Sequence, residues 1–358
     1  MRIALFTAVL LALPLFVATP AQGKVIIPNA NQNGVGAGWI QTFPDGATGN
    51  VHPVSGIVPG QVNPIVSASA VEYEPVENVL YVADFWGQAV RVYDASGNGG
   101  VAPLRTLKSL SLGQARIARV DRVRDELVAI AGMTRICTWP RLANGEDVAP
   151  TRCIPWGASS GSASQLNNPG GLALNRARRE IVVGDYSSAQ PYTNRILVFA
   201  RSADANASAP LRVIEGPNTQ LGSGTNVRVI VDEQRQFIIA LAGTRHDDST
   251  TSARILVFAA DASGDAAPIR AVQGALAGLE LSPGEYPTGL GYDEVNQMSL
   301  AAIGTNNPAG QGRVIAHWEF AQGDALPIYT LTGSQTGIGS VPGSPTATSD
   351  RLFRDGFD

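Results

Sequence analysis

A short pattern of hydrophobic and polar positions recurs along the whole chain. It reads Pro, any residue, usually Arg, any residue, then an aliphatic residue. Six copies begin at intervals of 47 to 60 residues, at 53–57, 103–107, 150–154, 210–214, 268–272 and 327–331. A fixed motif at this spacing indicates an internal repeat, and six copies predict six structural units.

Each copy follows a predicted β-strand that ends in an aromatic residue. These strands are expected at 40–43, 90–93, 136–139, 196–199, 255–258 and 314–318. Turn-forming residues in between, such as 94–99 and 261–265, predict a hairpin. A second pair of strands precedes each hairpin, for example 169–174 with 180–185. Four strands per unit at this period predict an all-β fold, a six-bladed β-propeller of four-stranded antiparallel blades.

Two of the units resemble the NHL-repeat family of β-propellers. The matching phrases are Leu-Tyr-Val-Ala-Asp at 80–84, leading to 90–93, and Val-Gly-Asp at 183–185, leading to 194–199. The resemblance implies a propeller from about residue 40 to residue 331, in a family that mostly binds proteins, nucleic acid or small ligands and includes some enzymes. Met133, Thr244 and Thr305 replace the aspartate in three other units, so it cannot form a ring of ligands.

The two ends of the chain are expected to close the ring together. Only five inner strand pairs lie between residues 65 and 304, against six outer pairs. Residues 24–28 can supply one missing strand, and 344–348 resemble the start of another unit and can pair with them. Such pairing would remove two open sheet edges. The alternative is five full blades plus an N-terminal hairpin, with 333–350 as a flexible linker.

The predicted domain plan is a signal peptide at 1–21, the propeller at 24–350 and a tail at 351–358. Residues 3–17 are mainly apolar, follow Met1-Arg2 and precede small residues suited to cleavage. No later stretch is apolar enough for a membrane span. The tail resembles Asp-Gly-Phe endings of exported proteins of some Gram-negative bacteria. We therefore expect a secreted or periplasmic bacterial protein.

Composition and charge narrow the fold and its partners. The chain has 39 Gly, 23 Pro and only 16% charged residues, which favours many short strands joined by turns. A net charge of -4 argues against nucleic acid as a partner. Cys137 and Cys153 fall opposite each other on the third and fourth strands of one unit, so we expect a disulfide, with two buried free thiols as the alternative.

Candidate ligand-binding residues lie in the loops between the second and third strands. These loops share one face of the propeller and combine aromatic with polar side chains, which suits sugars or peptides. The rim candidates are Trp86, Tyr186, Tyr192, Arg245, His246, Asp248, Asn306 and Asn307. The alternative is that these loops are polar only because they are exposed to solvent.

No catalytic residue, metal site or cofactor is predicted. His52 and His317 are expected to be structural, and a solvated loop is favoured over a metal site around His246. The sequence favours a non-catalytic propeller that binds a protein, peptide or glycan outside the cytoplasm. The alternative is a propeller-type hydrolase or lyase acting on a lactone or polysaccharide, with a metal or His in the central funnel. Inner strands such as 172–174 and 227–231 are mainly aliphatic and small, which favours binding.

Overall fold

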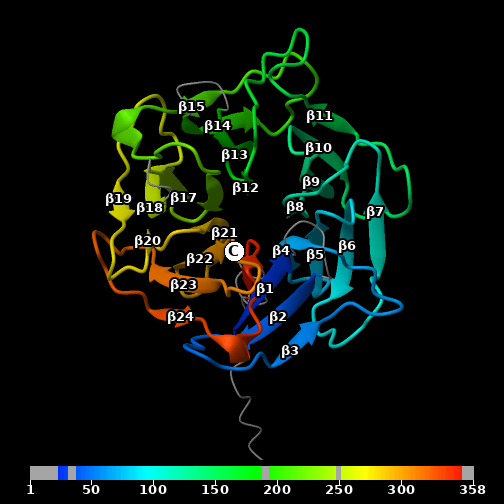
Figure 1. Cartoon of the computed structure of the whole chain (residues 1–358). Helices are drawn as coiled ribbons and strands as arrows, with labels where there is room; N and C mark the ends of the chain where they lie inside the picture. The colour runs from blue at the N-terminus through cyan, green and yellow to red at the C-terminus, as the bar shows by residue number, and fades with distance from the viewer. Residues whose placement is uncertain (1–22, 31–37, 188–192, 247–250, 349–358) are drawn as a thin grey trace, which may run out of the picture.

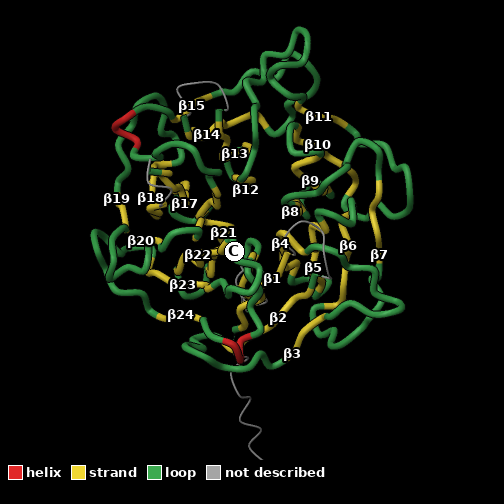
Figure 2. Tube along the Cα trace, in the orientation of Figure 1, coloured by secondary structure: helices red, strands yellow, loops and turns green. Residues whose placement is uncertain are grey.

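The structure is a ring of six antiparallel sheets, seen along its axis in Figure 1. This computed structural model describes residues 23–30, 38–187, 193–246 and 251–348. Loops join the strands throughout (Figure 2), and within the described residues the only helices are the short η2 (Pro217–Thr219) and η3 (Ser334–Thr336). None of the helices in that part of the chain is long and apolar enough to cross a bilayer. The predicted six-bladed propeller of four-stranded blades is confirmed.

Five blades, numbered 2 to 6, each use four consecutive strands, ordered from the axis outwards. Blade 2 contains β4 (Ala68–Glu74), β5 (Val79–Asp84), β6 (Ala89–Asp94) and β7 (Arg105–Lys108). Blade 3 contains β8 (Ala118–Asp121), β9 (Glu126–Ala131), β10 (Arg135–Pro140) and β11 (Arg152–Ile154). Blade 4 contains β12 (Gly171–Asn175), β13 (Glu180–Tyr186), β14 (Asn194–Ala200) and β15 (Arg212–Ile214).

The last two of these blades follow the same plan. Blade 5 contains β16 (Arg228–Asp232), β17 (Phe237–Arg245), β18 (Thr251–Ala259) and β19 (Arg270–Val272), and β20 (Glu280–Leu281) pairs with β18. Blade 6 contains β21 (Glu285–Asp293), β22 (Met298–Thr305), β23 (Arg313–Trp318) and β24 (Tyr329–Leu331). The third strands, β6, β10, β14, β18 and β23, cover the aromatic-ended segments predicted from the sequence. Their alternating aliphatic side chains pack between blades, and each of these strands contains at least two β-branched residues, which favour a packed sheet.

Blade 1 is built from both ends of the chain, as predicted. β1 (Lys24–Ala30) pairs with β2 (Trp39–Pro44), which pairs with β3 (Ser55–Ile57). On its other edge β1 pairs with β25 (Val341–Pro342) and β26 (Thr346–Thr348). The C-terminal segment is therefore the innermost strand of blade 1, and the five-blade alternative is excluded.

Buried amide side chains strengthen this closure. The Asn29 Nδ2 donates to Gln41 Oε1 at 3.0 Å, and the Gly339 amide donates to Asn29 Oδ1 at 2.9 Å. The Gln41 Nε2 in turn donates to the carbonyl of Thr336 at 2.7 Å. Because buried polar groups are costly when unpaired, these bonds fix the C-terminal segment against β1 and β2 in one register.

The arginine of the recurring Pro-x-Arg motif ties neighbouring blades together. Arg152 and Arg212 each bind a carboxylate of their own blade, Glu126 at 2.7 Å and Glu180 at 2.8 Å. They also donate to a carbonyl of the next blade, that of Arg201 at 3.2 Å and that of Ala260 at 2.7 Å. The motif therefore marks a repeated contact between blades rather than a ligand site.

The predicted disulfide is present between β10 and β11. Cys137 faces Cys153 in the register of the two strands, with their Cα atoms 4.1 Å apart. Equivalent pairs in other blades are aliphatic, Leu197 with Val213 and Leu256 with Ala271. The bond therefore replaces an ordinary hydrophobic pair and cross-links a single blade.

We expect a chain ending at residue 332 to be strongly destabilised. It would lose β25, β26 and the burial of Ile338, which together should cost roughly 5 kcal/mol of unfolding free energy. Urea unfolding followed by circular dichroism measures the loss. A chain ending at residue 348 is the matched control and should keep full stability. Equal midpoints for the two truncations would contradict the closure.

Removing the disulfide should lower stability without changing the fold. A Cys137→Val, Cys153→Ala variant imitates the aliphatic pairs of the other blades, so its loss reports the cross-link, about 3 kcal/mol for a loop of this length. Reductant should lower the unfolding free energy of the natural chain by a similar amount and leave the variant unchanged. A natural chain that is equally stable with and without reductant would refute this expectation.

Candidate functional site

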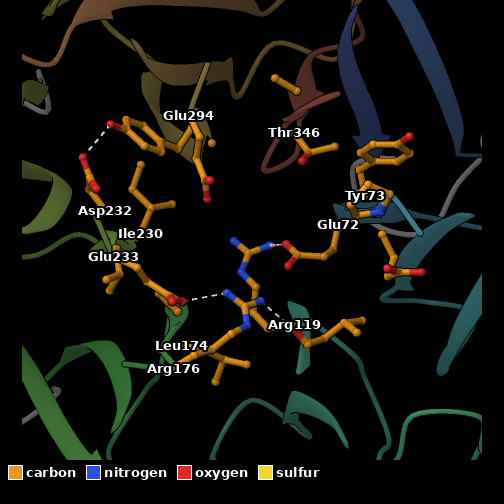
Figure 3. A pocket seen from close by; sticks show the side chains of 18 of the residues that line it. Glu72, Tyr73, Arg119, Leu174, Arg176, Ile230, Asp232, Glu233, Glu294 and Thr346 are labelled. Atoms are coloured by element: carbon orange, nitrogen blue, oxygen red, sulfur yellow. Dashed lines mark hydrogen bonds and ion pairs between the residues drawn. The ribbon is translucent and has the colours of Figure 1, made fainter. Parts of the chain in front are cut away.

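A cavity of about 650 Å³ lies on the axis of the ring, and we call it the funnel (Figure 3). It opens at the end where the innermost strands finish, because its lining comes from the last residues of those strands and the turns that follow them. Every blade contributes, with Thr346 from blade 1, Glu72 from blade 2, Arg119 from blade 3, Arg176 from blade 4, Asp232 from blade 5 and Tyr292 from blade 6. The funnel is therefore a product of the closed ring.

Two arginines cross-link three blades each within the funnel wall. The Arg119 Nη1 lies 2.9 Å from Glu72 Oε2 of blade 2, while its Nε donates to the carbonyl of Leu172 in blade 4 at 3.0 Å. The side chains of Arg119 and Glu72 meet in Figure 3. These interactions hold the polar groups of the wall in fixed positions.

Arg176 repeats this arrangement one blade further on. Its Nη1 lies 2.7 Å from Glu233 Oε1 of blade 5, and its Nη2 donates to the carbonyl of Val120 in blade 3 at 2.7 Å. Although burial opposes the charge, the carboxylates of Glu233 and Glu72 raise the pKa of Arg176 above its usual range. The wall thus presents charges of both signs that balance one another.

A buried pair of carboxyl groups, Asp232 and Glu319, lies between blades 5 and 6, with Asp232 in the funnel wall and Glu319 outside its lining. The Tyr292 hydroxyl lies 2.9 Å from Asp232 Oδ2 and 2.5 Å from Glu319 Oε2. Burial raises the pKa of Glu319, whereas hydrogen bonds from Arg235 and Tyr292 outweigh burial and lower the pKa of Asp232. The Tyr292 hydroxyl thus links two carboxyl groups whose pKa values are shifted in opposite directions.

The predicted rim residues lie at the opposite end of the ring from the funnel. Adjacent strands of a blade are antiparallel, so the loops after the second strands lie at the other end from the turns after the innermost strands. Trp86 is 42% exposed and its ring meets Phe85 edge-on, with centroids 5.0 Å apart. Arg245, His246, Asn306 and Asn307 are exposed, Tyr186 is half-buried, and Tyr192 and Asp248 lie outside the described residues.

The structure does not gather these rim residues into the funnel. Of the rim candidates in the described residues, only His246 lines a second, open cavity of about 480 Å³. Arg254, Glu280 and Asp324 also line this cavity. Its Nε2 lies 3.1 Å from Ser252 Oγ, so the ring is held by its own hairpin. The rim remains a prediction for a binding surface, separate from the funnel.

The aspartates of the NHL-like phrases anchor loops. Asp84 is fully buried and accepts hydrogen bonds from the Ser67 amide at 2.7 Å and the Arg91 Nε at 2.8 Å. Asp185 accepts equivalent bonds from the Asn168 amide at 2.9 Å and the Arg195 Nε at 3.0 Å. Each aspartate thus fixes the chain that enters its blade.

The sequence did not identify the funnel residues. The innermost strands were read as aliphatic and small, which is correct for their middle parts, but Glu72, Arg119 and Asp232 stand at or near the strand ends. The available signal was a charged residue near the end of several inner strands. In each unit alone, that charge is indistinguishable from an ordinary solvated turn residue.

His317 is fully buried in β23, as its predicted structural role requires. Burial lowers its pKa to about 4, and the nearby carbonyl groups of Ala277 and Ala325 offset only part of that effect. The unfolded chain binds the proton at about pH 6.5 and the folded chain only near pH 4. Stability from the neutral ring is therefore fully present above pH 6.5 and lost as the pH falls to about 4.

A His317→Gln variant should have a weaker pH dependence of stability. Between pH 7 and pH 4 the natural chain should lose about 3 kcal/mol more unfolding free energy than the variant, because glutamine does not titrate. Urea unfolding at several pH values measures the difference in slope, which is independent of any constant cost of the substitution. Parallel pH profiles for the two chains would show that His317 does not titrate in this way.

Comparison with known proteins supports the fold alone. No family model matches the sequence, and no curated protein matches it. Among solved structures, a chain of the nidogen/laminin complex is 12% identical, with a TM-score of 0.55 over 91% of this chain and 98% of that chain. The WD40 domain of coronin from Toxoplasma gondii is 10% identical, with a TM-score of 0.49 over 87% of this chain and 69% of that chain. The chain is a six-bladed β-propeller.

Proposed function

We propose that this chain is an exported, non-catalytic binding protein that recognises a protein, peptide or glycan. One observation carries the proposal. The funnel is preformed, receives residues from all six blades, and has charged side chains that are already held by partners in neighbouring blades. A rigid site of this kind binds a ligand without first having to be ordered.

The chemistry of the wall favours a polar ligand with groups of both signs. Tyr73 and Tyr292 offer aromatic surface beside the Arg119–Glu72 and Arg176–Glu233 pairs. Peptides and sugars combine apolar faces with hydrogen-bonding groups, and such mixed walls suit them. The rim around Trp86 and Arg245, at the opposite end of the ring from the funnel, is the competing surface proposed from the sequence.

The proposal includes the export of the protein, its division into domains and its relationship to a known propeller family. Residues 1–21 have the character of a signal peptide, the propeller spans 24–350, and the tail is 351–358. The disulfide is of the kind that persists in oxidising compartments. On the same sequence features, we propose that the protein is bacterial, works outside the cytoplasm and is related to the NHL-repeat propellers.

A propeller-type hydrolase or lyase is the second candidate, and the Asp232–Glu319 pair favours it. Two carboxyl groups with opposite pKa shifts are the usual arrangement for acid and base roles. However, Asp232 and Glu319 are each only 3% exposed, and Glu319 is not among the residues that line the funnel, so little of the pair is open to a ligand. Turnover of a lactone or polysaccharide that disappears in Glu319→Gln would establish this alternative.

Binding can be tested with a glycan array and a peptide display library, using residues 22–358. For any ligand found, an Arg176→Gln, Glu233→Gln double variant should bind at least about tenfold more weakly, about 1.4 kcal/mol, because the fixed charges are removed together. Trp86→Ala tests the rim, and Trp156→Ala, with a similarly exposed indole, is its control. Loss of binding only in Trp86→Ala would place the ligand on the rim, and an unchanged affinity in every variant would contradict both surfaces.

A further inference from the structure

Two arginines from different blades converge at the end of the channel remote from the funnel mouth. Arg228 is the first residue of β16, and Arg116 lies two residues before β8. The Arg116 Nη1 donates to the carbonyl of Pro169 at 3.1 Å, and the Arg228 Nη1 donates to the carbonyl of Gly170. Guanidinium groups of blades 3 and 5 therefore meet at two consecutive carbonyl groups of blade 4.

Neither arginine has a carboxylate partner among the residues that the structure describes. Arg116 is held by neutral groups, with Nη1 also 3.2 Å from Asn168 Oδ1 and Nη2 3.4 Å from Met133 Sδ. The Nε of Arg228 is buried and has no hydrogen-bond partner. This contrasts with Arg119 and Arg176 of the funnel wall, which both bind carboxylates.

The pair is electrostatically unfavourable as it stands. Burial lowers the pKa of Arg228 to about 9, and the charge of Arg116 contributes to this effect. Burial lowers the pKa of Arg116 to about 10. Both groups still keep their protons at neutral pH, so deprotonation cannot relieve the repulsion. An anion bound between the two guanidinium groups would relieve this repulsion.

The excess positive charge at this end of the ring is local. A Cβ on Gly171 would lie 2.6 Å from the Val229 amide nitrogen, so the inner strands of blades 4 and 5 approach each other closely here. Arg228 lies two residues before Ile230 of the funnel wall, roughly 7 Å deeper along the strand. Toward the funnel mouth the wall charges are paired, so the excess positive charge stays at the end near Arg116 and Arg228.

We propose that a small oxyanion, a free carboxylate or phosphate, binds between Arg116 and Arg228, at the end of the channel remote from the funnel mouth. Guanidinium groups bind both through paired N–H donors, and two of them that converge from different blades favour an anion. The site is separate from the funnel and does not depend on the function proposed for it.

Thermal unfolding of the whole mature chain in low-salt buffer, with increasing inorganic phosphate or acetate, tests the proposal. The unfolding temperature should rise saturably, by about 2 to 4 °C at ten times the dissociation constant. An Arg116→Gln, Arg228→Gln variant should lose this shift and should be at least as stable as the natural chain without added anion. Arg135→Gln removes an exposed charge from the same end of blade 3 and should keep the shift.

Calorimetric titration with phosphate provides a second measurement if the double variant does not fold. Arg116→Lys retains the charge but loses the planar pair of donors, so phosphate should bind about tenfold more weakly than to the natural chain. The proposal is overturned if the natural chain shows no saturable shift with either anion, if the double variant keeps the shift, or if Arg116→Lys binds phosphate as tightly as the natural chain.

Discussion

The pairing of β1 with the C-terminal strands β25 and β26 is the contact on which the rest of the structure depends. A blade buries its faces only against the next blade, so an open ring would expose two sheet faces and leave two strand edges unpaired. The funnel has residues from every blade, and its wall charges are held by contacts between blades. Closure is therefore a condition for the site as well as for stability.

Contacts between blades are polar at the periphery and at the axis, with hydrophobic packing between. At the periphery, arginines of the Pro-x-Arg motif bind a carboxylate of their own blade and a carbonyl of the neighbouring blade. Near the axis, Arg119 and Arg176 use the same combination of partners. Hydrogen bonds and ion pairs at the periphery and near the axis fix the orientation of each blade relative to its neighbours. Hydrophobic packing alone would leave this orientation less well defined.

In the described residues, the charged side chains of the channel are paired at the funnel mouth and have no carboxylate partner at the opposite end. The funnel mouth carries carboxylates and arginines that neutralise one another, and its walls can offer a polar ligand groups already in position. The opposite end carries Arg116 and Arg228 without a carboxylate partner in the described residues. One channel can therefore have two ends with different ligand chemistry, because the six inner strands bring different residues to each level.

Local patterns in the sequence determined the strands, the six units, the disulfide and the closure of the ring. Periodicity and strand register depend on neighbouring residues, so the facing of Cys137 and Cys153 follows from counting along one hairpin. Only the tertiary structure decided the site. Glu72 and Arg119 are 47 residues apart, Arg116 and Arg228 are 112 apart, and the repeat length varies, so nothing in the sequence aligned them. The closed ring brings them to one axis, where burial and charge give them their chemistry.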